Sequence, residues 1–323
     1  MVAVTIHVGS SFPPEAEREL GAGLAGHHVD RPAAPSASNL VAHSDDTVIE
    51  AEVVFGQPSP AALARSPRLR WIHLTSAGYT RYVGEPVRGS LAGRGIALTT
   101  SSTVYAEPCA THALALVLAL LRQLPAALDD QRGARAWPAA ELRQASRVLH
   151  GARVLLLGFG AIGRRLAALV APFGADVVAL RAHPRGDEPV RAIGPADLDR
   201  ELERADVIIS SLPEDESTVG LMSRARFERI QHGAVFVNVG RGTTVDQAAL
   251  VDALASGRLG AVGLDVTDPE PLPADHPLWS HPRALITPHT AGGRADEHVR
   301  LVRHFLENLA RYERGEALVD RVI

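Results

Sequence analysis

Three side chains in this sequence, Arg241, Glu270 and His289, are of the types that do acid–base chemistry on an anionic substrate, and each follows a predicted strand. A guanidinium offers a planar fork of N–H donors that matches a carboxylate. An imidazole has an unperturbed pKa of about 6.5, and an adjacent carboxylate favours its protonated form. Singly, such residues are usually surface or structural residues. Brought together, they would supply an anion clamp, a general acid and the carboxylate that orients it.

The strongest local motif is a Gly-x-Gly-x-x-Gly turn that follows a predicted strand and opens a predicted helix. Gly158 permits the tight turn, Gly160 lets the backbone approach a pyrophosphate, and Gly163 lets helix and strand pack closely. At the start of the helix, the N–H groups of residues such as Ala161 and Ile162 favour a bound phosphate. The motif therefore predicts a dinucleotide site.

Cofactor choice is read about twenty residues after this turn, where an Asp or Glu would bind the ribose 2′-hydroxyl of NAD. Here Arg181 takes that place, with Arg185 nearby, whereas Asp176 comes too early and Asp187 falls in the loop beyond. A guanidinium pairs well with a 2′-phosphate. We therefore expect NADP(H) to be preferred, with NAD(H) as a second cofactor. The alternative is that Arg181 is a solvated loop residue.

Short apolar segments alternate with polar connections along the chain, which is typical of α/β structure. In the second part strands and helices alternate strictly, which predicts a parallel, doubly wound sheet whose carboxyl ends bind ligands. The predicted strands cover residues 2–8, 47–55, 69–74, 153–157, 176–180, 207–212, 234–239, 261–266 and 284–286.

Two long helices are predicted besides a short one over residues 14–22. Residues 107–124 are apolar and tolerate Pro108 near the first turn, which suits a domain boundary or a subunit contact. Residues 295–314 are amphipathic and are expected to pack back across the first domain. The most apolar stretch, residues 113–121, is too short to span a bilayer, so we expect no membrane partner.

Composition excludes several classes of protein. The 323 residues are 46% apolar, which favours two domains, and a net charge of −4 with scattered basic residues argues against nucleic acid. No lysine occurs, which excludes a Walker-type loop, a Schiff-base enzyme and the Tyr–Lys pair of short-chain dehydrogenases. One cysteine, Cys109, cannot form a disulfide or a thiolate metal site, so we expect a cytoplasmic protein without a metal centre. His73, Cys109 and His112 are interpreted as packing residues.

The order of these motifs resembles the D-isomer-specific 2-hydroxyacid dehydrogenase family, and the match runs from about Val53 to the C-terminus. The L-lactate and L-malate dehydrogenases fit poorly, because the dinucleotide turn lies in the middle of the chain. The segments that carry the resemblance are Trp71–Gly78, Ala106–Arg122, Gly158–Gly163, Asn238–Gly242, Asp265–Pro273, Pro288–Gly293 and a closing segment, Leu318–Val322, that resembles the family's last strand.

The resemblance implies roles for single residues. Arg241 would bind the substrate carboxylate and oxo group, and His289 would exchange the proton on the C2 oxygen. Glu270 would hold His289 and favour its charged form, and Asp265 would bind the nicotinamide carboxamide. The loop that contains Thr75 to Tyr79 is small and Gly-containing, as close backbone approach requires.

The same resemblance assigns the backbone N–H groups of Ser76, Ala77 and Gly78 to the substrate carboxylate and Pro213 to the adenosine pocket. It implies a Rossmann dinucleotide-binding domain, residues 99–290, inserted in a flavodoxin-like substrate domain made of residues 1–98 and 291–323. Both domains would contain doubly wound parallel sheets. We expect a homodimer in which residues 106–124 contribute apolar surface.

The expected function is reduction of a small 2-oxo acid of the glyoxylate or hydroxypyruvate type to the D-2-hydroxy acid. Two alternatives stay open: a formate- or phosphite-type dehydrogenase on the same fold, and a dinucleotide-sensing binding protein similar to the C-terminal-binding-protein corepressors. The sequence Tyr79-Thr-Arg81-Tyr82 stands where many family members have a more compact Val-Asp continuation, so the substrate side chain stays undetermined.

Overall fold

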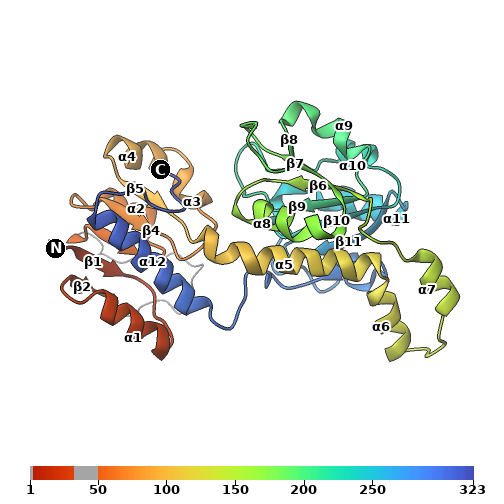
Figure 1. The fold of residues 1–323 in the computed structure, drawn as a ribbon, viewed down its shortest axis with the longest axis horizontal. Coiled ribbons are helices and arrows are strands. Elements are labelled where there is room, and N and C mark those ends of the chain that lie inside the picture. Colours follow the sequence, from red (N-terminus) through yellow and green to blue (C-terminus); the bar gives the residue numbers. More distant parts are fainter. Residues whose placement is uncertain (1–2, 33–49) are drawn as a thin grey trace. The chain divides into compact units, whose positions relative to one another are not determined.

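The computed structural model describes residues 3–32 and 50–323, so the predicted strands over 2–8 and 47–55 each begin outside the described residues. The chain forms two compact units (Figure 1). Unit 1 contains Met1–Tyr105 and Arg294–Ile323, and unit 2 contains Ala106–Gly293. The α/β fold class predicted from the sequence is confirmed, because each unit contains a parallel sheet with helices between its strands.

Unit 1 is built on a five-stranded sheet in the order β2-β1-β3-β4-β5, and all neighbouring strands pair in parallel. Its strands are β1 (Thr5–Val8), β2 (His28–Asp30), β3 (Val53–Phe55), β4 (Trp71–His73) and β5 (Ala97–Thr99). Its helices are α1 (Pro14–Gly23), α2 (Pro60–Ala64), α3 (Thr80–Val83), α4 (Val87–Gly93) and α12 (Glu297–Glu313).

The last helix, α12, returns to the sheet of unit 1, as its amphipathic pattern predicts. Val302, Phe305 and Leu309 on one of its faces join the apolar core around β1, β3 and β4. The ring of Phe305 stacks on Phe55 with centroids 4.2 Å apart and on Trp71 with centroids 5.4 Å apart. Full burial of one such aromatic side chain stabilises a fold by about 1.5–3 kcal/mol, so α12 is an integral part of this unit.

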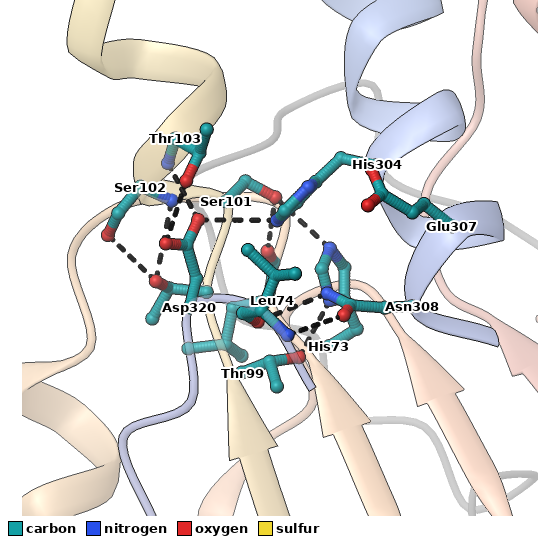
Figure 2. A network of polar contacts seen from close by, with 12 residues as sticks. His73, Leu74, Thr99, Ser101, Ser102, Thr103, His304, Glu307, Asn308 and Asp320 are labelled. Carbon is teal, nitrogen blue, oxygen red and sulfur yellow. Dashed lines mark hydrogen bonds and ion pairs between the residues drawn. The ribbon is translucent and has the colours of Figure 1, made fainter. Parts of the chain in front are cut away.

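The closing segment, residues 318–322, which resembles a last strand, pairs with β5 through backbone hydrogen bonds but forms no regular strand. The segment forms a single antiparallel bridge, between Thr99 and Arg321, because Asp320 adopts a left-handed backbone with φ of 56° that interrupts an extended run. Asp320 instead accepts hydrogen bonds from the backbone N–H and the hydroxyl of Thr103, and its carboxylate lies 3.2 Å from Nε2 of His304 (Figure 2). Burial alone would raise the pKa of Asp320, but the contacts with His304 and Thr103 lower it below its ordinary value.

Unit 2 is built on a seven-stranded parallel sheet in the order β12-β11-β10-β9-β6-β7-β8. Its strands are β6 (Arg153–Leu157), β7 (Asp176–Leu180), β8 (Arg191–Ile193), β9 (Val207–Ser210), β10 (Ala234–Asn238), β11 (Leu259–Leu264) and β12 (Ala284–Ile286). Its α-helices are α6 (Leu124–Arg132), α7 (Ala139–Ala145), α8 (Ala161–Val170), α9 (Leu198–Leu202), α10 (Arg224–Arg229) and α11 (Gln247–Ala255). Short 3₁₀ turns cover Ala171–Phe173, Pro195–Asp197, Gly242–Thr244 and Pro277–Ser280.

The strand order of unit 2 reverses direction at β6, since β7 lies on one side of it and β9 on the other. In open parallel sheets, ligands bind outside the carboxyl ends of the strands at such a switch point. The segments that leave β6, β7, β9, β10, β11 and β12 are therefore the ones that can form a site, and all the residues singled out in unit 2 lie on them.

A long helix, α5 (Ser102–Leu121), begins in unit 1 and continues into unit 2. Its length and composition would suffice to cross a membrane, but half of its apolar window is buried inside the protein. Ala110, Ala113 and Val117 are fully buried, and Gly263 of β11 leaves room for Leu116 and Leu120. The contacts are those of a core helix in a globular protein.

Candidate active site

The turn after β6 has the geometry that a dinucleotide phosphate requires. Gly158 has a φ of 99°, which L side chains rarely adopt, and a Cβ on Gly163 would lie 2.2 Å from the Gly158 carbonyl oxygen. No side chain caps the first turn of α8, and the space beside Gly160 is open. The N–H groups of Ala161 and Ile162 have no acceptor within the helix, so they are available to an anionic group.

At the end of β7, Arg181 is bound by a carboxylate of its own loop. Its Nη1 donates to Glu188 Oε1 at 3.1 Å, and the Glu188 side chain is only 3% exposed. Glu188 also accepts from the backbone N–H groups of Arg185, at 2.9 Å, and Gly186, at 2.8 Å. The N–H of Arg185, together with that of Gly186 and the guanidinium, lowers the pKa of Glu188 below its ordinary value. Arg181 is therefore an ion-paired residue in this structure, and its side chain is 21% exposed.

Next to the same sheet edge, Pro213 lies half-buried after β9, and its carbonyl oxygen accepts a hydrogen bond from the Thr218 hydroxyl at 2.7 Å. This contact closes a turn over residues 213–218. Pro213 thus has a fixed position at the carboxyl end of β9, which is the neighbour of β6 in the sheet.

Arg241 is presented by a tight turn after β10. Asn238 shapes the turn, since its Nδ2 donates to the Arg241 carbonyl oxygen and its Oδ1 accepts from the N–H of Gly240, both at 3.0 Å. The Thr244 hydroxyl donates to the same Arg241 carbonyl at 2.7 Å. The guanidinium donates to the Gly240 carbonyl oxygen at 2.6 Å and makes no ion pair with any carboxylate of residues 3–32 and 50–323. Its charge is therefore available to an anionic ligand.

His289 and Glu270 form the hydrogen-bonded pair that the sequence predicts. His289 Nδ1 lies 2.8 Å from Glu270 Oε2, and the two side chains are 40% and 38% exposed. The other carboxylate oxygen, Oε1, accepts from the N–H of Thr267 at 3.1 Å, which fixes the orientation of Glu270. Because an ionised carboxylate only accepts hydrogen bonds, Nδ1 carries a proton, and Nε2 is the atom left to exchange one with a ligand.

The backbone of His289 has a φ of 52°, an uncommon conformation for a residue with a side chain. Such strain costs about 1–3 kcal/mol and persists only where the surroundings fix it. Asp265 provides that restraint: its carbonyl oxygen accepts from His289 N at 2.8 Å. Its carboxylate, 1% exposed, accepts from the hydroxyl of Thr287 at 2.6 Å and from the N–H groups of Thr290 and Ala291, both at 2.9 Å.

In unit 1, the loop after β4 presents backbone donors. The N–H groups of Ser76, Ala77 and Gly78 have no acceptor within the described part of the chain. Gln57, a buried residue after β3, donates from Nε2 to the hydroxyls of Ser76, at 2.9 Å, and Thr75, at 3.2 Å, while the Ser76 hydroxyl donates to the Gly78 carbonyl at 2.7 Å. These bonds fix the loop through its hydroxyl groups and leave its backbone N–H groups for an anion such as a carboxylate.

A family model, that of the D-isomer specific 2-hydroxyacid dehydrogenase NAD binding domain, matches residues 114–291. The chain belongs to the D-isomer specific 2-hydroxyacid dehydrogenase family. The match covers the strands β6 to β12 and the segments that carry Arg241, Glu270 and His289.

The chain is similar to members of this family that are named for different activities. D-3-phosphoglycerate dehydrogenase of Mycobacterium tuberculosis is 31% identical over 98% of this chain, which spans 58% of that protein. Glyoxylate/hydroxypyruvate reductase B of Citrobacter koseri is 32% identical over 77% of this chain and 76% of its own. A D-isomer specific 2-hydroxyacid dehydrogenase from Xanthobacter autotrophicus Py2, solved with NADPH and MES, aligns with a TM-score of 0.82 at 28% identity, covering 100% of this chain and 98% of that one.

Two side chains of this family member have contacts that the sequence did not predict. Gln57 follows a buried strand, and its polar type at that position was the available signal. His112 was interpreted as a packing residue, and that interpretation is incomplete: its Nε2 lies 2.9 Å from the Thr287 hydroxyl. Cys109 and His73 are buried, and His73 Nδ1 lies 2.7 Å from the Thr99 hydroxyl. Within residues 3–32 and 50–323, no cluster of three acidic, His or Cys side chains could hold a metal ion.

Proposed function

We propose that this chain reduces a small 2-oxo acid of the glyoxylate or hydroxypyruvate type to its D-2-hydroxy acid, as a cytoplasmic enzyme that prefers NADP(H). The observation that carries the proposal is the His289–Glu270 pair, held at the carboxyl edge of the sheet that also carries the dinucleotide turn. An imidazole that is hydrogen-bonded on one nitrogen and exposed on the other suits general acid catalysis near neutral pH.

Each residue of the proposed site has its own role in the reduction. The Arg241 guanidinium binds the carboxylate and polarises the C2 oxo group, because its charge has no carboxylate partner in the described chain. His289 then donates the Nε2 proton to the C2 oxygen as that oxygen gains negative charge, and Glu270 stabilises the imidazolium through Nδ1. The backbone N–H groups of Ser76, Ala77 and Gly78 are assigned to the substrate carboxylate. A bound nicotinamide cofactor supplies the hydride that C2 receives.

The side chain of the substrate is inferred from what the loop of unit 1 lacks. A phosphorylated substrate needs cations near the carboxylate site. Arg81 follows the loop but is exposed, and Tyr82 is buried with its hydroxyl donating to the Pro58 carbonyl at 2.8 Å. Arg81 is therefore the one cation beside this loop that we weigh, and we assign an unphosphorylated 2-oxo acid because it agrees with the relative of which this chain spans the larger share.

Preference for NADP(H) over NAD(H) rests on Arg181 at the end of β7. Only one of its N–H donors is committed to Glu188, so the rest of the fork can bind a 2′-phosphate. Glu188, the carboxylate beside Arg181, is turned toward the N–H groups of Arg185 and Gly186, so it is not assigned to a ribose 2′-hydroxyl. Pro213 and Asp265 are assigned to the adenosine and the carboxamide ends of the same cofactor.

A homodimer is proposed through the segment after α5, which extends the surface expected from residues 106–124. Trp137 is 86% exposed, and Leu124 and Leu128 are also largely exposed, which is costly for a monomer in water. A pocket of about 840 Å³ lies between α6 and α7, with Trp137 in its wall. A second copy of the chain is the partner proposed for this surface. Light scattering of wild-type protein and Trp137→Ser at micromolar concentration tests it, and a wild-type monomer mass would contradict it.

The function is tested by following NADPH and NADH oxidation with a panel of 2-oxo acids that includes glyoxylate, hydroxypyruvate, pyruvate and 3-phosphohydroxypyruvate. We expect the first two to give the highest kcat/KM and the product to be the D isomer. Oxidation of formate or phosphite in the reverse assay would support the dehydrogenase alternatives. Dinucleotide binding without turnover of any acid would support the binding-protein alternative.

A further inference from the structure

A chain of hydrogen bonds links α5 to the segment that carries His289. His112 Nε2 lies 2.9 Å from the Thr287 hydroxyl oxygen, and that hydroxyl lies 2.6 Å from Asp265 Oδ1. The direction of each bond follows from the groups involved. Asp265 already receives N–H groups from Thr290 and Ala291, so it acts as an acceptor, and the single Thr287 proton is donated to it. The Thr287 oxygen must then accept from Nε2–H of His112.

This arrangement fixes the tautomer of His112 and the rotation of the Thr287 hydroxyl. A hydroxyl rotates freely unless both its donor and its acceptor positions are engaged. With His112 on one side and Asp265 on the other, Thr287 has only one favourable orientation, in which Asp265 accepts three hydrogen bonds. The carboxylate is nearly inaccessible to water, so loss of one donor could not be replaced by solvent without local rearrangement.

His289 depends on these bonds because it lies between their attachment points. Thr287, on the N-terminal side of His289, is bound to Asp265. Thr290 and Ala291, on the C-terminal side of His289, are bound to the same carboxylate. The N–H of His289 itself donates to the Asp265 carbonyl. The same N–H also lies 3.0 Å from the Thr287 carbonyl oxygen. Asp265 is therefore the residue bound on both sides of His289, whose left-handed backbone directs its ring toward Glu270.

We propose that His112 is a positioning residue for the reaction: through Thr287 and Asp265 it holds the segment 287–291 in the conformation that presents His289. The inference rests on the proposed role of His289 as the proton donor. His112 does not touch the reacting atoms in this assignment. Its place on α5 connects the segment 287–291 to a helix that packs directly on β11 of the same sheet.

Matched substitutions separate this role from packing. His112→Leu keeps the volume but removes the donor, whereas His112→Gln retains an N–H donor at about the position of Nε2. One neutral hydrogen bond changes an equilibrium by about 2- to 13-fold. We therefore expect His112→Leu to lower kcat about 3- to 10-fold at unchanged KM for the cofactor, and His112→Gln to restore most of it. Thr287→Val should give a similar loss, and His112→Leu with Thr287→Val should be no worse than Thr287→Val alone.

A readout independent of turnover is hydrogen exchange at the amides of Thr290 and Ala291. Exchange should accelerate in His112→Leu and Thr287→Val and stay slow in His112→Gln. Equal kcat and equal exchange in wild type and His112→Leu would overturn the inference, and so would additive losses in the double variant. If instead wild type reduces no 2-oxo acid, or His289→Ala retains full turnover, the proposed function fails, while the exchange experiment still reports on the hydrogen-bond chain.

Discussion

Two buried carboxylates, Asp265 after β11 and Glu188 after β7, are bound in nearly the same way but have opposite effects on the neighbouring residues. Each side chain is almost fully inaccessible, and each accepts two backbone N–H groups. Those bound by Glu188 belong to its own loop, whereas those bound by Asp265 belong to the segment after β12. The third donor differs. For Asp265 it is the neutral hydroxyl of Thr287, and for Glu188 it is the guanidinium of Arg181.

This difference shows what a buried anion can do beside a functional residue. Asp265 holds the backbone of His289 and leaves its ring to Glu270 and to a ligand. Glu188 holds the charged group of Arg181 itself, so part of that charge is neutralised before a ligand arrives. Arg241, in contrast, has no carboxylate partner among the described residues. We therefore expect the catalytic end to respond to substitution with large losses and the adenosine end with smaller changes in specificity.

The largest effect is expected at His289. His289→Ala removes the proposed general acid, a kind of group that contributes about 10²- to 10⁴-fold, while the turn at Gly158–Gly163 is unaffected. Turnover of the best 2-oxo acid should fall by that range with unchanged NADPH affinity, measured by steady-state kinetics and by fluorescence titration. Turnover near that of wild type would remove His289 from the mechanism.

Arg241→Lys tests whether the guanidinium of Arg241 binds the substrate carboxylate. A lysine keeps the charge but loses the planar fork, and a charge-assisted hydrogen bond contributes about 1.5–3 kcal/mol. We expect kcat/KM for the 2-oxo acid to fall roughly 10- to 100-fold, through both a higher KM and a lower kcat. Unaltered constants would mean that another residue binds the carboxylate.

Arg181→Ala tests the paired cation at the other end. The ratio of kcat/KM with NADPH to that with NADH should fall by roughly one to two decades, because the contact with a 2′-phosphate is lost. The experiment is repeated at high salt, which screens an exposed contact. Arg185→Ala is the comparison variant, since Arg185 binds Glu188 through its backbone N–H only, and we expect it to lower the same ratio less than Arg181→Ala does. A wild type that uses both cofactors equally would contradict the assignment.

Glu188→Gln sharpens the comparison in the opposite direction. It removes the negative charge beside Arg181 and keeps one acceptor oxygen, so one of the two backbone N–H groups that bind Oε1 and Oε2, those of Arg185 and Gly186, loses its acceptor. The Arg181–Glu188 ion pair is partly exposed and screened by solvent, so the preference for NADPH should rise by only a few fold. Titration with 2′,5′-ADP and with 5′-AMP, which differ by the phosphate, measures it without catalysis. A weaker preference would show that Glu188 instead orients Arg181.

The smallest effect concerns stability and a third buried cluster, in unit 1 (Figure 2). Burial, and then the charge of His304, holds the pKa of His73 well below 6.5, so the unfolded chain binds a proton that the folded chain does not. Stability should therefore decrease as the pH falls below about 6.5, and the melting temperature of His73→Gln should depend less on pH in that window. His232→Gln, an exposed histidine, is the control and should follow wild type. Parallel curves for all three proteins would contradict the assignment.

The periodic pattern of the sequence predicted most strands of the fold, and the reason for the omissions is physical. The bounds of β6, β7 and β12 agree with the predicted ones. The strands without a prediction are β2, β5 and β8, and all three lie at the edge of a sheet. The exposed residues of β2 and β8 explain two of these omissions, because a strand that buries few side chains carries little apolar pattern. The strand β5 is mostly buried, but three residues are too few to show a period. The absence of a last strand could not be predicted, because Asp320 acts through a contact with Thr103, 217 residues away.

The same distinction applies to the site. The sequence by itself determined the residue types, their order and their place after successive strands, which suffices for the turn at Gly158–Gly163 and for the pair of His289 with Glu270. Arg181 and Arg241 follow strands in the same way, and no local pattern distinguishes them. Only the tertiary structure decided that Arg181 meets a carboxylate and that His112 meets Thr287 across 175 residues of chain. Hydrogen bonds depend on distance and direction between groups, and the path of the chain sets both.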